Sequence, residues 1–195
     1  MYEFILPQDF LIGTANSAFQ SEGAWDRDGK SMSMMDHYSM AMAGQPIPAS
    51  LNAKTVRYVS HDTPADGCFF YDNYEAYIED MAKTGQNTYR FSIAWPRVIP
   101  TGVGEVNPKG IEFYNKVINK LLENNITPFE DILHWDLPQC LKEKGGYANP
   151  EFPDWYEAFA KVCFESFGDR VKLWSTFNEC DIAVARGYGA GTFPP

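Results

Sequence analysis

The chain has 195 residues, of which 45% are hydrophobic and 15% aromatic, so it can bury a sizeable core and is not a disordered chain. Its formal net charge of −10 argues against nucleic acid and against anionic membrane surfaces as partners, because both require a basic face. No apolar stretch is long enough to span a bilayer, and the first residues lack the basic region of a signal peptide.

The first predicted element is a strand within residues 10–23 that opens into a loop. The stretch starts with Phe10-Leu11-Ile12 and continues with small and polar residues up to Gly23. Small side chains let the backbone approach a ligand closely, although an ordinary turn is the commoner explanation of such a stretch. Residues 24–66 show no sustained hydrophobic period and are expected to form a long loop with about one helical turn.

Helices and strands alternate along the rest of the sequence. Apolar residues recur at helical spacing in three segments, with Pro108 in the first turn of one helix and Gly168 just after another. Short runs rich in β-branched and aromatic residues follow each helix and predict strands. The helices are expected at residues 72–83, 108–125 and 153–167, and the strands at residues 88–95, 127–133 and 171–179.

This alternation predicts an α/β fold with a parallel sheet and right-handed crossovers. The glycine-rich phosphate motifs of doubly wound sheets are absent, whereas every strand ends in polar or aromatic residues, as in a (β/α)8 TIM barrel. Such a barrel has eight strands, so residues 1–195 are expected to be the N-terminal half of a single barrel domain, with four βα units. A half barrel has two unpaired edges, and we expect self-association through them.

Cysteine and histidine usage gives no sign of a disulfide or a metal centre. The cysteines form no C-x-x-C pair, so we expect reduced thiols and a cytoplasmic location. The histidines lie far apart without metal-ligand spacing, so we expect no metal and no other cofactor. The residues concerned are Cys68, Cys140, Cys163 and Cys180, and His37, His61 and His134.

Two charged positions stand out at strands. Arg90 lies inside a predicted strand, where it either extends outward into solvent or, inside a barrel, needs a carboxylate partner. Asn178 and Glu179 follow the last predicted strand, at the rim where α/β enzymes place their chemistry. The alternative is that Glu179 is an ordinary solvated residue at the start of the next helix.

Four motifs follow one another along nearly the whole chain: Phe10–Glu22, Tyr89–Arg97, His134–Gln139 and Thr176–Glu179. Together they resemble the motifs of glycoside hydrolase family 1, the β-glucosidases and 6-phospho-β-glucosidases. The resemblance implies a retaining β-glycosidase that hydrolyses terminal β-linked glucose from a β-glucoside or oligosaccharide. Such enzymes use one carboxylic acid and one nucleophilic carboxylate about 5–5.5 Å apart.

The resemblance also implies roles for residues at matching positions. Glu179 would be the general acid that protonates the leaving oxygen and then the base that activates water. Arg90 would lie beside the nucleophilic carboxylate and keep it ionised. The remaining residues would bind hydroxyls of the sugar, with Asn178 on the 2-hydroxyl; they are Gln20, His134, Trp135 and Asn178.

The sequence departs from the family pattern in several places. The family's nucleophilic glutamate lies in the second half of the barrel, so these residues alone are expected to be inactive. Cys180 stands where the family usually has proline after the Asn-Glu pair. Met35 replaces a usual tryptophan, and Asn73 replaces a common histidine.

Two alternatives to a β-glucosidase remain open at the level of sequence. One is a 6-phospho-β-glucosidase of the same family, because the residues that read the phosphate lie in the second half of the barrel. The other is a non-catalytic half barrel that binds sugar or pairs with a copy of itself. The substrate and the oligomeric state respectively would distinguish them.

Overall fold

The computed structural model describes residues 5–42 and 67–194, and they form one parallel sheet with helices on its outer face. The strands follow the chain in the order β1-β2-β3-β4, and neighbours along the chain are neighbours in the sheet. This arrangement confirms the expected α/β fold with four strands of a barrel. The strands are β1 (Gly13–Ala15), β2 (Thr88–Ser92), β3 (Thr127–Leu133) and β4 (Leu173–Phe177).

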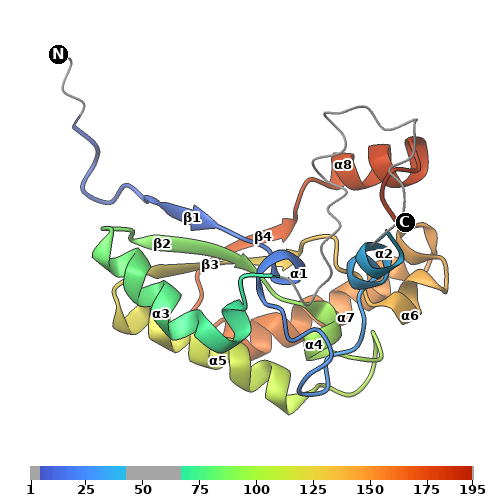
Figure 1. Cartoon of the computed structure of the whole chain (residues 1–195), viewed down its shortest axis with the longest axis horizontal. Helices are drawn as coiled ribbons and strands as arrows, with labels where there is room; N and C mark the ends of the chain where they lie inside the picture. The colour runs from blue at the N-terminus through green and yellow to red at the C-terminus, as the bar shows by residue number, and fades with distance from the viewer. Residues whose placement is uncertain (1–4, 43–66, 195) are drawn as a thin grey trace.

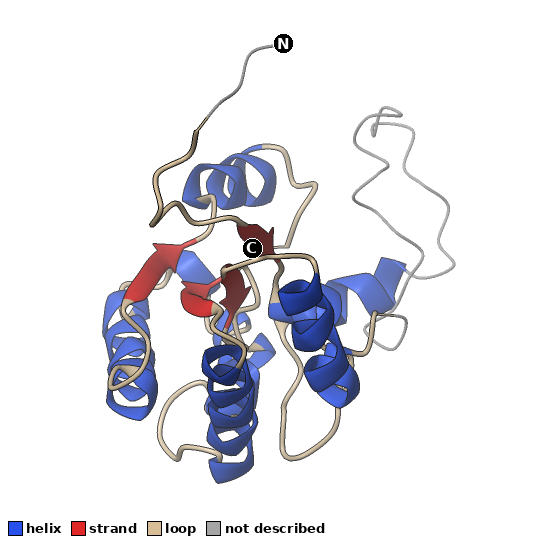
Figure 2. Cartoon of the chain, turned by 90° about the vertical axis from the view of Figure 1, so that its left-hand side faces the viewer, coloured by secondary structure: helices blue, strands red, loops and turns tan. Residues whose placement is uncertain are grey.

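The three long helices follow the helical periodicity of the sequence and connect successive strands. Figure 1 shows them below the strands, and in Figure 2 the red strands form a curved row with most of the helices beneath it. None of the helices in the described part of the chain is long and apolar enough to cross a membrane. The three helices are α3 (Phe70–Lys83), α5 (Pro108–Glu123) and α7 (Phe152–Phe167).

Helix α5 shows how local sequence sets these boundaries. The side chain of Asn107 accepts a hydrogen bond from the backbone N–H of Lys109, and Pro108 occupies the first turn, where no N–H is needed. The apolar stripe of the helix is buried under the sheet, with Val117, Ile118 and Leu121 wholly inaccessible to solvent. Its packing follows from the 3.6-residue period that predicted it.

The remaining elements are short, and the sequence anticipated only one of them, as about one helical turn within residues 24–66. Met34–Met42 is a nine-residue helix within the expected long loop; the rest of that loop, residues 43–66, lies outside the described residues. The short elements are α1 (Ala18–Ser21), α2 (Met34–Met42), α4 (Trp95–Val98), α6 (Gln139–Lys142), η2 (Gly146–Ala148), α8 (Cys180–Ala183) and η3 (Val184–Gly189).

Two of the expected strands were too long, and the one expected over residues 171–179 spans only Leu173–Phe177. The strand expected over residues 88–95 ends at Ser92, because Pro96 sits in the first turn of α4, where its fixed φ suits a helix. The first strand begins at Gly13 and leaves Phe10, Leu11 and Ile12 before it, all three exposed. Gly13 is the point of closest approach, since a Cβ there would lie 1.8 Å from the carbonyl oxygen of Thr88.

A buried ion pair ties the segment after β1 to the helical layer. The Nε of Arg97 in α4 donates to Glu22 at 2.9 Å, and the hydroxyl of Tyr114 in α5 donates to the other oxygen of the same carboxylate. The guanidinium lies 4.2 Å from the centre of the Tyr71 ring. Since Arg97 and Glu22 are both buried, removing either charge would leave the other buried without an ionic partner.

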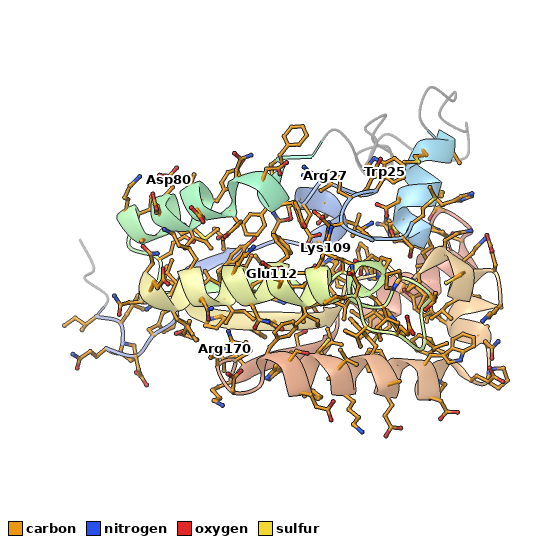
Figure 3. The ribbon with its side chains drawn as sticks, turned by 90° about the horizontal axis from the view of Figure 1, so that it is seen from below. Trp25, Arg27, Asp80, Lys109, Glu112 and Arg170 are labelled. Atoms are coloured by element: carbon orange, nitrogen blue, oxygen red, sulfur yellow. The ribbon has the colours of Figure 1, made fainter. Side chains whose placement is uncertain are left out.

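A second buried carboxylate, Glu130 in β3, has no such partner. The side chain is wholly buried, and neither oxygen has a hydrogen-bond partner within the described part of the chain. Burial raises its pKa well above the ordinary value of 4.5, with the positive charge of Arg170 opposing the shift. Arg170, labelled in Figure 3, lies between α5 and α7 and donates to Asn115 and Asn119 instead.

We expect Glu130→Met to stabilise the fold at neutral pH by about 1–4 kcal/mol, because the substitution removes an unpaired buried carboxylate at similar volume. The raised pKa means that the folded chain binds this proton more tightly than the unfolded chain does. The contribution of this bound proton to the free energy of unfolding is therefore fully present below the ordinary pKa of the group. It is lost as pH rises through the raised pKa of the folded chain. Urea unfolding at several values between about pH 5 and pH 8 measures both effects.

The advantage of Glu130→Met over the parent chain should grow as pH rises. Glu165→Met is the matched control, since Glu165 is exposed on α7 and should change stability by less than about 0.5 kcal/mol. An equal or smaller stability of Glu130→Met at neutral pH would contradict the assignment of an unpaired buried carboxyl.

Candidate active site

Polar residues within β2, β3 and β4 and in the segments that follow β3 and β4 meet around the carboxylate of Asp131. Asp131 lies in β3 and is wholly buried. One of its oxygens, Oδ2, accepts from Arg90 of β2 at 2.6 Å and lies 2.9 Å from Nδ1 of His134. The other, Oδ1, accepts from the hydroxyl of Ser175, its register partner in β4, at 3.1 Å.

Arg90 points to the inner face of the sheet, so the expected carboxylate partner exists. Besides Asp131, its Nη2 donates to Oδ1 of Asn178 at 2.9 Å and lies 3.4 Å from Ser175. About a quarter of the side chain, 24%, remains exposed. The guanidinium therefore links three strands while it still reaches the surface at the ends of the strands.

The backbone after β3 is fixed to the backbone after β4. Asn178 donates from its N–H to the carbonyl of Leu133 at 2.9 Å, and the indole Nε1 of Trp135 donates to the carbonyl of Asn178 at 2.7 Å. The ring of Trp135 packs edge-on against that of His134, with centroids 5.2 Å apart. These contacts bring His134, Trp135 and Asn178 together, as the sequence motifs imply.

Trp135 and Glu179 both have left-handed backbone conformations, with φ of 67° and 45°. Each is the second residue after its strand, since β3 ends at Leu133 and β4 at Phe177. A residue other than glycine in this region costs of order 1–3 kcal/mol, and such residues cluster at functional sites. Glu179 has an exposed side chain and directly precedes α8.

Gln20 is the expected site residue that the structure does not join to the others. It lies in α1 and is exposed, and its Oε1 accepts from the hydroxyl of Ser17 at 2.6 Å. Its neighbour Phe19 does reach the site, with its ring 6.3 Å from that of His134. Helix α1 follows β1 at the same edge of the sheet as the other residues (Figure 1).

A small apolar pocket of about 10 Å³ adjoins Trp135 on the side of α2 and α8. An apolar wall beside polar residues is typical of small-molecule sites. Met35, which stands where the sequence motifs lead us to expect tryptophan, is part of this wall. The pocket is lined by Met34, Met35, Trp135, Ile182, Ala183, Phe193 and Pro194.

Sequence reasoning missed Asp131 and Ser175, and only Asp131 carried a usable signal. Two adjacent acidic residues inside a strand, Glu130 and Asp131, must face opposite sides of the sheet. One of them therefore had to lie on the inner face with Arg90. Ser175 looked like an ordinary strand residue, and nothing in its surroundings marked it.

A family model and solved structures both match nearly the whole chain. The family model described as glycosyl hydrolase family 1 matches residues 2–195. Among solved structures, a family 1 β-glucosidase from Thermotoga maritima superposes with a TM-score of 0.86 and 42% sequence identity, covering 97% of this chain and 40% of that one. The same enzyme has been solved in complex with castanospermine, with equal identity and coverage.

Curated relatives come from plants and bacteria. The chain is 44% identical over 189 residues to the wheat (Triticum aestivum) chloroplastic 4-hydroxy-7-methoxy-3-oxo-3,4-dihydro-2H-1,4-benzoxazin-2-yl glucoside β-D-glucosidase 1d, covering 96% of this chain and 31% of the relative. It is 42% identical over 186 residues to the 6-phospho-β-glucosidase GmuD of Bacillus subtilis, covering 95% and 37%. The chain thus spans about a third of the length of the curated relatives it matches.

Proposed function

The chain belongs to glycosyl hydrolase family 1, and we propose on that basis that its four βα units supply the acid/base half of a retaining β-glucosidase site. Glu179 would protonate the oxygen of the departing group and then, as a base, activate the water that completes hydrolysis. The nucleophilic carboxylate would come from a barrel strand beyond the four described here.

The observation that carries this proposal is the position of Glu179. It follows β4 in a left-handed conformation, and its neighbour Asn178 is held by Arg90 from β2 and by the backbone after β3. A strained backbone fixed from two sides defines the point from which the side chain extends, and a general acid needs a defined position relative to the bond it protonates.

The other residues would bind and orient the sugar. His134 and Asn178 offer an imidazole and an amide to its hydroxyls, while the ring of Trp135 offers an apolar face. Gln20 would contribute from α1 at the same edge of the sheet. Arg90 would lie close to the nucleophile and favour its ionised form, because an opposite charge within about 4–6 Å stabilises a carboxylate.

We propose a plain glucoside as the substrate, with a 6-phosphoglucoside as the alternative. The wheat relative is described as a β-D-glucosidase of a benzoxazinyl glucoside, and the apolar residues beside Trp135 would offer such an aglycone a surface to pack against. The similarity to GmuD favours the alternative, at nearly the same identity. Both substrates require the same acid, so the group at the sugar 6-position decides between them.

We expect the protein purified from its source cells to hydrolyse p-nitrophenyl β-glucoside at least about tenfold faster than its 6-phosphate at equal concentration. A site without cationic or hydrogen-bonding partners for a phosphate would bury that dianion unpaired. The affinity for the 6-phosphate would then be lower by at least about tenfold. The rate of p-nitrophenol release measures it, with p-nitrophenyl β-galactoside as the control for the sugar. Faster turnover of the phosphate would establish the alternative instead.

The open edges of the sheet support a further proposal, that the isolated chain self-associates. Within the described residues, β1 pairs only with β2 and β4 only with β3, so the outer edge of each has unpaired backbone groups. Exposed apolar residues lie beside the edge at β1, including Ile12. Light scattering of the purified chain over a range of concentrations would show larger species, and a monomer at every concentration would contradict the proposal.

A further inference from the structure

We propose that Asp131 is a positioning residue of the sugar-binding site, which fixes His134 with its proton on Nδ1 and leaves Nε2 as a hydrogen-bond acceptor for the ligand. The proposal rests on the proposed function for the identity of the ligand as a sugar. Its structural part, the state of the imidazole, stands on the geometry alone.

The contacts of Asp131 decide which atom carries the proton. Its Oδ2 already accepts from Arg90 at 2.6 Å, and guanidinium groups only donate. That oxygen therefore acts as an acceptor, and the imidazole nitrogen 2.9 Å away must be its second donor. The hydroxyl of Ser175 occupies Oδ1 in the same way, so the carboxylate is surrounded by donors on both sides.

The remaining nitrogen of His134, Nε2, has no hydrogen-bond partner within the described residues. A neutral imidazole with its proton on Nδ1 carries an unshared electron pair on Nε2. The ring contacts those of Phe19 and Trp135, with centroids 6.3 Å and 5.2 Å away. A sugar hydroxyl at this position would thus donate to Nε2 rather than accept from it.

Because Asp131 is buried, its carboxylate has a large effect on the orientation of His134. The carboxylate is wholly inaccessible to solvent, while Arg90 and His134 both keep some exposure at the ends of the strands. A charged acceptor inside the sheet orients donors that face the ligand, in the way that outer carboxylates orient metal-binding histidines. Replacing the carboxylate would free the ring to adopt the other tautomer.

Nitrogen-15 NMR of the 195-residue chain tests the tautomer directly. Long-range proton–nitrogen correlation distinguishes protonated from unprotonated ring nitrogens, and His134→Gln assigns the signals against those of His37 and His61. At pH values high enough that the imidazole chemical shifts no longer change with pH, we expect a protonated Nδ1 and an unprotonated Nε2. In Asp131→Val we expect the proton to move largely to Nε2.

Two further variants serve as a control and as a replacement for Asp131→Val. Ser175→Ala removes the contact at Oδ1 and the longer one to Arg90, but leaves the contact between Oδ2 and His134 in place. It should therefore leave the tautomer unchanged and is the matched control. Asp131→Asn preserves the shape of the side chain and should retain part of the Nδ1–H population if Asp131→Val fails to fold. A protonated Nε2 in the parent chain, or the same tautomer with and without the carboxylate, would overturn the proposal.

The sugar-binding part is tested in a chimera in which residues 1–195 replace the matching segment of the Thermotoga maritima β-glucosidase. We expect Asp131→Val to raise KM for p-nitrophenyl β-glucoside by about tenfold or more, the value of a charge-assisted contact, and Ser175→Ala to raise it much less. An unchanged KM would refute the positioning role. A parent chimera that folds but hydrolyses no glucoside would count against the proposed function, while the NMR result would still decide the tautomer.

Discussion

Glu179→Gln is expected to lower kcat/KM of the chimera for cellobiose by about 10² to 10⁴-fold, the usual contribution of a general acid. Glutamine keeps the shape of the side chain but has no proton to give to the leaving oxygen. The loss should be far smaller in the first chemical step for 2,4-dinitrophenyl β-glucoside, whose leaving group departs without protonation. Steady-state and burst kinetics with both substrates measure the difference.

Asp181→Asn is the matched control for this prediction. Asp181 is also an exposed carboxylate, lies two residues further along in α8, and undergoes the same change in charge. It should leave both rates close to those of the parent chimera. Unchanged hydrolysis of cellobiose by Glu179→Gln would mean that another group supplies the proton and that the role assigned to Glu179 is wrong.

Arg97→Met is expected to destabilise the fold by about 3–5 kcal/mol, because it leaves the buried carboxylate of Glu22 without its positive partner. The hydroxyl of Tyr114 still donates to Glu22, but one neutral donor does not replace a guanidinium. For a chain of this size the change corresponds to a fall in melting temperature of about 6–20 °C. Circular dichroism during heating and in urea measures it.

Arg27 provides an internal control for this prediction. Its guanidinium lies over the same ring of Tyr71, at 5.2 Å, but it pairs with Asp72 on the surface, where both side chains are about half exposed. Arg27→Met should therefore change stability by no more than about 1 kcal/mol. Equal effects of the two substitutions would show that contact with the ring, rather than the buried charge, stabilises the fold.

The regular layers of this fold could be predicted from the sequence, because each long helix has an apolar stripe and β2, β3 and β4 each lie in a run rich in β-branched and aromatic residues. The predicted boundaries failed where a short helix replaced the end of a strand, as at Trp95, because four residues are too few to show a period. The parallel order followed from the alternation itself.

The candidate site could be predicted only in part. Motifs pointed to Arg90, His134, Trp135, Asn178 and Glu179, and the structure brings these residues to one edge of the sheet. The left-handed backbone of Trp135 and Glu179 had no signal, because neither residue is one that adopts this conformation readily. It arises from tertiary contacts that hold the ends of two strands against each other.

The sheet order β1-β2-β3-β4 also bears on how the chain is made. Among the described strands, each one after the first pairs with the strand synthesised before it, so none of these four has to be inserted between two others. A ribosome adding about 5–20 residues per second needs several seconds for each further βα unit, and small units fold faster than that. Every new strand can therefore dock onto a finished edge as it emerges, and assembly of the barrel can keep pace with translation.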